Sequence, residues 1–205
     1  MKKVGVLISG RGSNLQALLD AASAGSLGGE IAVVVSNVEG AAGLERARRA
    51  GVPALVSDHR GRSREDHDAA VAGLLAARGV ELVCLAGYMR LLSPVFLRAF
   101  PGRVLNVHPS LLPAFPGRDA QRQAWEHGVK VSGATVHVVD EGLDAGPIVA
   151  QEAVPVLEED GPDELAARIL EAEHRIYPSA VRIMLEGRGR LEGRRLRIEG
   201  RTRPG

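Results

Sequence analysis

The sequence predicts an α/β fold: a doubly wound, mostly parallel sheet with helices on both faces. Apolar runs of strand length alternate with longer segments of helical period, as expected for parallel strands joined by crossover helices. These runs show little polar alternation, which is typical of strands covered on both faces. With 205 residues, of which 45% are hydrophobic, the chain can form one domain with a sizeable core.

The elements are expected in the following order. Strands are expected at residues 4–8, 31–35, 82–86 and 104–107. Helices are expected at residues 15–24, 44–50 and 64–77, with Ser63 capping the last of them. Ser93 and Pro94 begin another short helix. Residues 132–139 and 147–156 are expected to form a later pair of strands. A long helix over residues 162–184, bent near Pro178, then closes the domain.

Composition argues against several functional classes. A formal net charge of +1 and an aromatic content of 3% do not suggest nucleic-acid binding. The single Cys84 lies in an apolar run and cannot form an intrachain disulfide, which fits a reducing compartment. Lys2 and Lys3 precede only about six apolar residues, too few for a signal peptide or a membrane span. We therefore expect a cytoplasmic protein without a membrane partner.

The loop SGRGSN, residues 9–14, follows the first strand and precedes a helix. Its glycines allow successive N–H groups to point into one concavity, and the helix N-terminus favours an anion. A third Rossmann glycine would fall at Leu15, and no Lys-Ser/Thr pair completes a P-loop. The loop thus indicates a monophosphate site rather than a dinucleotide site. The alternative is a tight turn that binds no ligand.

Two further segments, NVHPSLLPAFPG and DEGLDAGP, supply an amide, an imidazole and a carboxylate through Asn106, His108 and Asp144. An amide can donate to an oxyanion, an imidazole can transfer a proton, and a carboxylate can hold the imidazole and favour its charged form. This set suits a site that polarises a carbonyl without a protein nucleophile. The alternative is a histidine at a strand end followed by an ordinary proline turn.

A third segment, GYMRLLSP, also follows a predicted strand, so all three strand-end loops can line one crevice. Met89, Leu91 and Leu92 would form an apolar slot there, and Arg90 would offer a fork for a carboxylate. Taken alone, this segment is better explained as a strand that leads into a helix, with a solvated Arg90.

Together these motifs resemble the glycinamide ribonucleotide formyltransferases. The matching segments, in family order from about residue 3 to residue 185, are LISGRGSNLQALLDA, SNVEGAAGLERARRAGVP, SRE at 63–65, LAGYMRLLSP, VLNVHPSLLP, GATVHVVDEGLDAGPIVAQ and EHRIYP. The resemblance implies the formyltransferase fold, with a Rossmann-like N-terminal half. It also implies transfer of the formyl group of 10-formyltetrahydrofolate to the amine of 5-phosphoribosylglycinamide in purine biosynthesis. We expect one domain over residues 1–187, with a phosphate-binding half to about residue 100 and a catalytic, folate-binding half beyond it.

The resemblance also implies roles for individual residues. Catalysis falls to Asn106, His108 and Asp144, with His137 as a possible accessory histidine or merely a strand residue beside the cleft. The ribonucleotide would be held by Gly12, Ser13, Asn14 and Glu173. The folate would be held by Arg64, Met89, Arg90, Leu91, Leu92, Asn106 and the loop that contains Asp140 and Glu141. Asp119, Gln121 and Leu170 depart from the family pattern, which puts loop closure in doubt and places more of the phosphate affinity on the first loop.

The expected reaction is direct transfer through a tetrahedral intermediate, without an acyl-enzyme and without a metal. The expected binding partners are the two small-molecule substrates, and the expected state is a monomer or homodimer. The alternatives are a formyltetrahydrofolate hydrolase, a methionyl-tRNA formyltransferase, for which the chain is too short, and a non-catalytic nucleotide-binding module. The final residues, 188–205, contain seven arginines and two glutamates and are expected to form an edge strand over 191–198 and a frayed tail.

Overall fold

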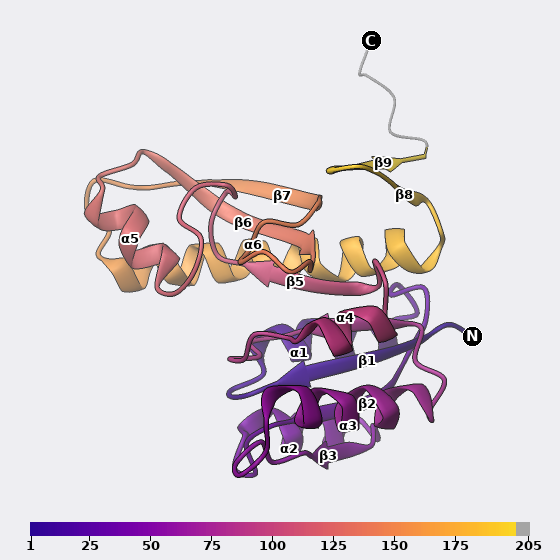
Figure 1. The fold of residues 1–205 in the computed structure, drawn as a ribbon. Coiled ribbons are helices and arrows are strands. Elements are labelled where there is room, and N and C mark those ends of the chain that lie inside the picture. Colours follow the sequence, from indigo (N-terminus) through magenta and orange to yellow (C-terminus); the bar gives the residue numbers. More distant parts are fainter. Residues whose placement is uncertain (200–205) are drawn as a thin grey trace.

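A computed structural model describes residues 1–199 as one sheet with six helices (Figure 1). The strands are β1 (Lys3–Ile8), β2 (Glu30–Ser36), β3 (Ala54–Val56), β4 (Leu82–Leu85), β5 (Val104–His108), β6 (Val131–Val138), β7 (Ile148–Pro155), β8 (Gly189–Glu192) and β9 (Arg195–Ile198). The helices are α1 (Ser13–Ser23), α2 (Ala42–Arg49), α3 (Arg64–Ala76), α4 (Pro94–Ala99), α5 (Ala120–Glu126) and α6 (Pro162–Leu185).

The elements expected within residues 1–187 are all present, and β3 and α5 are additional. β3 has only three residues and α5 only seven, so neither is long enough to show a clear hydrophobic period. The expected N-cap of α3 is confirmed, because the Ser63 side chain accepts the N–H of Asp66 at 3.0 Å. The long helix α6 continues through Pro178.

The strand order is β3-β2-β1-β4-β5-β6-β7-β9-β8. The strands from β3 to β5 run parallel to their neighbours, whereas β6 pairs antiparallel with both β5 and β7. The chain builds outward from β1 to β3 and then returns to place β4 on the other side of β1. The sheet therefore has its switch point between β1 and β4, where open α/β sheets bind ligands beyond the strand carboxyl ends.

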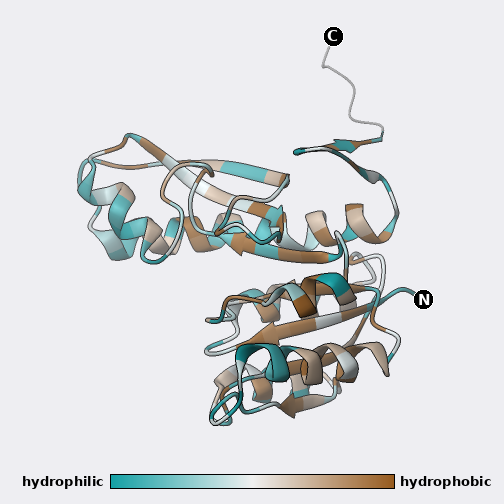
Figure 2. Cartoon of the chain, viewed as in Figure 1, coloured by the Kyte–Doolittle hydropathy of each residue, from teal (hydrophilic) through white to brown (hydrophobic). Residues whose placement is uncertain are grey.

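Helices cover both faces of the sheet, as the sequence predicts, and the side chains of each parallel strand alternate between two cores. Val4, Val6 and Ile8 of β1 enter the core that includes residues of α1, α2, α5 and α6, whereas Leu7 enters the core under α3 and α4. Figure 2 shows β1 and β5 largely in the hydrophobic colours. Burial on both faces explains why these strands appear in the sequence as continuous apolar runs.

A buried tyrosine fixes α6 against the sheet. The hydroxyl of Tyr177 lies 2.9 Å from the carbonyl oxygen of Leu85 and 3.1 Å from that of Leu105, at β4 and β5. Since Tyr177 is fully buried, these are the groups that satisfy its hydroxyl. The contact sets the position of α6, and so of Glu173 one turn earlier.

The single edge strand expected over residues 191–198 is wrong, because this segment belongs to a two-stranded hairpin. β8 and β9 pair antiparallel through a turn at Gly193, whose φ of 59° lies in the left-handed region that favours glycine. β9 joins the sheet at one position, where Arg195 pairs with Ile148 of β7. The expected frayed tail over residues 200–205 falls outside the described residues. Within residues 1–199 no helix is long and apolar enough to cross a membrane.

Candidate active site

The three loops singled out in the sequence lie at the carboxyl ends of adjacent parallel strands. SGRGSN follows β1, GYMRLLSP follows β4, and HPSLLP continues from the last residue of β5. The strand order places all three loops at one end of the sheet, as expected. A fourth segment, between β6 and β7, leaves β6 at the amino end of β5, because Val138 pairs with Leu105. It then folds back and places Asp144 against His108, the last residue of β5.

Asp144 lies between two buried imidazoles. Its Oδ2 is 3.4 Å from Nδ1 of His108, and its Oδ1 is 3.6 Å from Nε2 of His137. His137 is the direct cross-strand partner of Asn106, and its Nε2 lies 3.3 Å from Nδ2 of that amide. The N–H of Gly117 donates to Oδ2 of Asp144 at 2.8 Å. The structure thus assembles the amide, both histidines and the carboxylate in one cluster.

Both ring nitrogens of His108 face acceptors. Nε2 lies 2.8 Å from the carbonyl oxygen of Phe115, which can only accept, so Nε2 carries a hydrogen. With a carboxylate beside Nδ1, this arrangement suits an imidazolium. Burial nevertheless lowers the pKa of His108, and the bond to Phe115 and the charge on Asp144 offset only part of this effect. Asp144 thus favours the charged form of His108, as expected, but burial outweighs its effect on the pKa.

The carboxylate itself stays ionised. Burial acts to raise the pKa of Asp144, but hydrogen bonds from His137 and the Gly117 N–H, with the charge on His108, hold it below its ordinary value. Asp144 has a φ of 49°, in the left-handed region that non-glycine residues seldom adopt. The loop thus places a charged group between two imidazoles with a backbone conformation that costs free energy.

Nearby hydroxyl and thiol groups are poorly suited to nucleophilic attack. Cys84 is fully buried in β4, and burial raises the pKa of its thiol to about 12. The hydroxyl of Ser110 is buried and donates to the carbonyl oxygen of Ala114 at 2.5 Å. Within residues 1–199 no group of three or more His, Cys, Asp or Glu side chains is placed to hold a metal ion.

The phosphate loop, residues 9–14, packs against α2. Gly12 has a φ of 73°, and a Cβ there would lie 2.7 Å from the Cα of Gly43, so a side chain is excluded on two grounds. The N–H of Gly43 donates to the carbonyl oxygen of Gly10 at 3.0 Å. Because α1 begins at Ser13, the first N–H groups of that helix are available at the loop.

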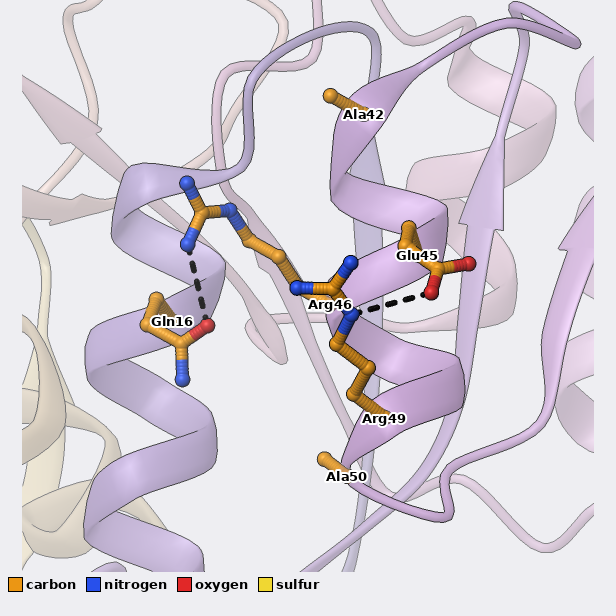
Figure 3. A pocket seen from close by; sticks show the side chains of 6 residues that line it. All are labelled: Gln16, Ala42, Glu45, Arg46, Arg49 and Ala50. Carbon is orange, nitrogen blue, oxygen red and sulfur yellow. Dashed lines mark hydrogen bonds and ion pairs between the residues drawn. The ribbon is translucent and has the colours of Figure 1, made fainter.

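An arginine of α2 also holds this loop. Nε of Arg46 donates to the carbonyl oxygen of Arg11 at 2.9 Å. Its Nη1 donates to Oε1 of Gln16 at 3.2 Å, a bond that Figure 3 shows. These side chains, with Arg49, line a surface cavity of about 520 Å³ between α1 and α2. None of its lining residues belongs to the Asp144 cluster, so we regard this cavity as lying outside the candidate active site.

Asn14 and Glu173 form a buried pair that joins α1 to α6. Nδ2 of Asn14 donates to Oε2 of Glu173 at 2.7 Å, while Oδ1 of Asn14 is buried and has no partner within residues 1–199. Burial raises the pKa of Glu173 to about 7, although the bond from Asn14 counters part of this effect. The Asn14 amide thus gives one N–H to Glu173, and the backbone N–H of Asn14, in the first turn of α1, is available to an anion.

The residues expected on the folate side are more open. Met89 and Leu91 are 68% and 61% exposed, so they present apolar surface without covering one another, and Leu92 is half-buried. Nε of Arg90 is buried and lacks a partner among the described residues. Arg64 is half-exposed, with Nη2 3.6 Å from Oε1 of Glu65. In the loop before Asp144, Asp140 and Glu141 are exposed, and Oδ1 of Asp140 accepts the N–H of Gly142.

Three contacts of the cluster escaped the sequence analysis. These are the bond from Gly117 to Asp144, the bond from His108 to Phe115, and the pairing of Asn106 with His137. The first two involve backbone atoms, which leave no signal in residue types.

Of the departures from the family pattern, Asp119 has a φ of 56° at the start of α5 and Leu170 is half-buried on α6.

Comparison with known proteins gives consistent matches. The family described as formyl transferase matches residues 2–181. Phosphoribosylglycinamide formyltransferase of Haemophilus influenzae is 42% identical over 205 residues, which cover 100% of this chain and 97% of that protein. The Drosophila melanogaster trifunctional purine biosynthetic protein adenosine-3 is 51% identical over 189 residues, covering 91% of this chain but only 14% of that protein.

Solved structures match along most of the chain. Glycinamide ribonucleotide transformylase 1 from Symbiobacterium toebii has a TM-score of 0.95 and 61% identity, over 97% of this chain and 94% of that one. A formyltetrahydrofolate deformylase from Pseudomonas syringae pv. tomato has a TM-score of 0.90 and 30% identity, over 96% of this chain and 65% of that one. The formyltransferase fold expected from the sequence is confirmed.

Proposed function

The chain belongs to the formyl transferase family, and from this premise we propose that it transfers the formyl group of 10-formyltetrahydrofolate to the amine of 5-phosphoribosylglycinamide. The products are N-formyl-phosphoribosylglycinamide and tetrahydrofolate, in a step of purine biosynthesis. The observation that carries the proposal is the placement of Asp144 against His108, beside Asn106, at the carboxyl end of β5. The trifunctional relative and the bacterial formyltransferase named above support the choice of acceptor.

The cluster supplies the groups that this transfer needs. The neutral amine attacks the formyl carbon, and the formyl oxygen becomes an oxyanion that accepts hydrogen bonds from Nδ2 of Asn106 and from protonated His108. As the intermediate collapses, the bond from carbon to N10 breaks, N10 gains a proton and the former amine loses one. His108 moves the proton, and Asp144 holds the ring and its charge through the transfer.

Substrate binding follows the two halves of the crevice. The N–H groups of the loop at Gly12, Ser13 and Asn14 hold the phosphate, assisted by the N-terminus of α1, and Glu173 binds the ribose or amine end. On the folate side, Arg90 and Arg64 meet the carboxylates of the benzoylglutamate. The apolar side chains at 89, 91 and 92 and the backbone of the loop over residues 140–144 hold the pteridine. In this assignment the half to about residue 100 supplies the phosphate site, and residues 101–187 supply the catalysis.

A hydrolase that releases formate is the second candidate, because the deformylase from Pseudomonas syringae shares the fold. One experiment separates the two. The purified protein is given 10-formyltetrahydrofolate with and without 5-phosphoribosylglycinamide, and deformylated folate is followed by absorbance. We expect release only when the ribonucleotide is present, and Asn106→Ala should slow it. Equal release in the absence of the ribonucleotide would establish hydrolysis and overturn the proposed acceptor.

A further inference from the structure

Two side chains that have no part in the proposed chemistry hold the segment over residues 87–93, called here the folate loop. The N–H of Met89 donates to Oγ of Ser9 at 2.9 Å, near the start of the loop. At the other end, the N–H of Ser93 donates to Oδ2 of Asp68 at 2.6 Å. The loop is therefore attached at two points outside it, namely the first residue of the phosphate loop, directly after β1, and the helix α3.

The attachment at Ser9 is directional. Its hydroxyl hydrogen is donated to Oδ1 of Asn37 at 2.5 Å, so the hydroxyl oxygen is left to accept the N–H of Met89. Asn37 is buried, and its Nδ2 lies 3.3 Å from Nδ1 of His59. A chain of polar contacts thus runs from the segment after β3, past the end of β2, to the folate loop. The orientation of the Ser9 hydroxyl is therefore set by the buried Asn37 and not by solvent.

The attachment at Asp68 uses a buried charge. Asp68 is 1% exposed, and placing a carboxylate in the interior is unfavourable unless hydrogen bonds compensate it. Its compensating neighbours are the N–H of Ser93 and the fully buried His67, whose Nδ1 lies 3.5 Å from Oδ1. His67 is held in turn, since its Nε2 lies 2.8 Å from the carbonyl oxygen of Ser57. A charge-assisted bond in this setting is stronger than an ordinary one.

Between these two points the loop presents two apolar side chains and one donor that has no partner among the described residues. Met89 and Leu91 are largely exposed, and Nε of Arg90 is buried without a partner among residues 1–199. A buried donor that lacks a partner is unfavourable, so this atom points to an acceptor supplied by a ligand. The backbone from which these groups project is the backbone that Ser9 and Asp68 restrain.

We propose that Ser9 and Asp68 are positioning residues that fix the folate loop from two sides, so that affinity for the formyl donor depends on side chains that do not touch it. This inference rests on the proposed function, because it takes the loop as the folate site. It predicts a selective effect. Loosening the attachment at Asp68 weakens binding of the donor and leaves binding of the ribonucleotide at the phosphate loop unchanged. Ser9 is the first residue of the phosphate loop, so its loss should weaken binding of the donor more than binding of the ribonucleotide.

The test compares Ser9→Ala, Asp68→Asn and Asp68→Ala with matched controls. Ser26→Ala removes an exposed hydroxyl that bonds only to a local carbonyl oxygen, and Asp66→Asn removes an exposed carboxylate from the first turn of the same helix. KM for 10-formyltetrahydrofolate should rise about tenfold or more in Ser9→Ala and Asp68→Ala. KM for the ribonucleotide should stay within about twofold of the parent in Asp68→Ala, and in Ser9→Ala it should rise less than KM for the folate. Asp68→Asn should give a smaller rise, because an amide oxygen still accepts the N–H of Ser93.

Hydrogen exchange supplies a readout that is independent of turnover. The amides of Met89 and Ser93 should exchange faster in the variants that remove their acceptors, and at the parental rate in both controls. If Asp68→Ala does not fold, Ser9→Ala and Asp68→Asn carry the test. Unchanged folate KM with parental exchange, or equal rises in both KM values, would overturn the inference. A parent enzyme that transfers no formyl group would instead refute the proposed function, and faster amide exchange would then support only the attachment of the loop.

Discussion

Replacing Glu173 by glutamine should flatten the dependence of stability on pH. Glu173 is buried beneath the candidate ribonucleotide site, and burial raises the pKa of its carboxyl from 4.5 to about 7. The folded state therefore favours the protonated carboxyl. This contribution to stability is fully present below about pH 4.5 and is lost as the pH rises through about 7. Glutamine has nearly the same shape, keeps an oxygen for the Asn14 amide, and cannot ionise.

The gap between 4.5 and about 7 corresponds to about 3 kcal/mol of free energy of unfolding. About 2 kcal/mol of this falls between about pH 5.5 and about pH 8.5. Over that interval the parent should lose about 2 kcal/mol more than Glu173→Gln. A change of this size is a large fraction of the stability of a typical domain.

Urea denaturation followed by circular dichroism at several pH values measures this difference. Glu171→Gln is the matched control, because it removes an exposed carboxylate from the same helix two residues earlier. The control should follow the parent curve. If Glu173→Gln also follows the parent curve over the whole interval, Glu173 ionises as an ordinary carboxyl, and the argument from its burial is wrong.

Three other substitutions give distinct expected results. Asp144→Asn should lower the pKa of His108 further and reduce single-turnover transfer about 10²- to 10⁴-fold, and an unchanged NMR titration would contradict their coupling. Arg46→Met should raise KM for the ribonucleotide in steady-state kinetics, whereas Arg49→Met should not, because of the two arginines only Arg46 bonds to the phosphate loop. Equal rises in KM for the two variants would show that Arg46 acts through its positive charge and not through its bond to the loop. Gly133→Ala should lower the free energy of unfolding by at least about 2 kcal/mol, because its Cβ would overlap a carbonyl oxygen of β7; parental stability in urea denaturation would show that the strand pair relaxes.

The sequence predicts most of the fold because its main signals are strong. Strands such as β1 and β4 are buried on both faces and appear as apolar runs, and α6 is long enough to show its period. β3 and α5 are too short to give such a signal, and the hairpin of β8 and β9 depends on one glycine turn.

The candidate site, like the fold, has parts that the sequence predicts and parts that it does not. Parallel topology alone indicates that the loops after β1, β4 and β5 meet at one end of the sheet. The contact between His137 and Asn106 depends on the register of an antiparallel pair, which the lengths of intervening loops determine. The direction in which the pKa of His108 shifts depends on burial, which follows from the folded structure and not from the identity of neighbouring residues.

The bond between His108 and the Phe115 carbonyl makes substrate recognition by this histidine a competition between acceptors. Nε2 already has an acceptor at 2.8 Å, so a substrate oxygen gains only the difference between its own bond and the one it displaces. On the proposed chemistry, the neutral formyl oxygen would replace one carbonyl with another and gain little. The developing oxyanion is a charged acceptor for the imidazolium, so it forms a stronger bond than either neutral carbonyl and displaces Phe115. Competition from the Phe115 carbonyl thereby weakens the net interaction of His108 with the bound substrate more than its interaction with the transition state. Such a difference accelerates the reaction.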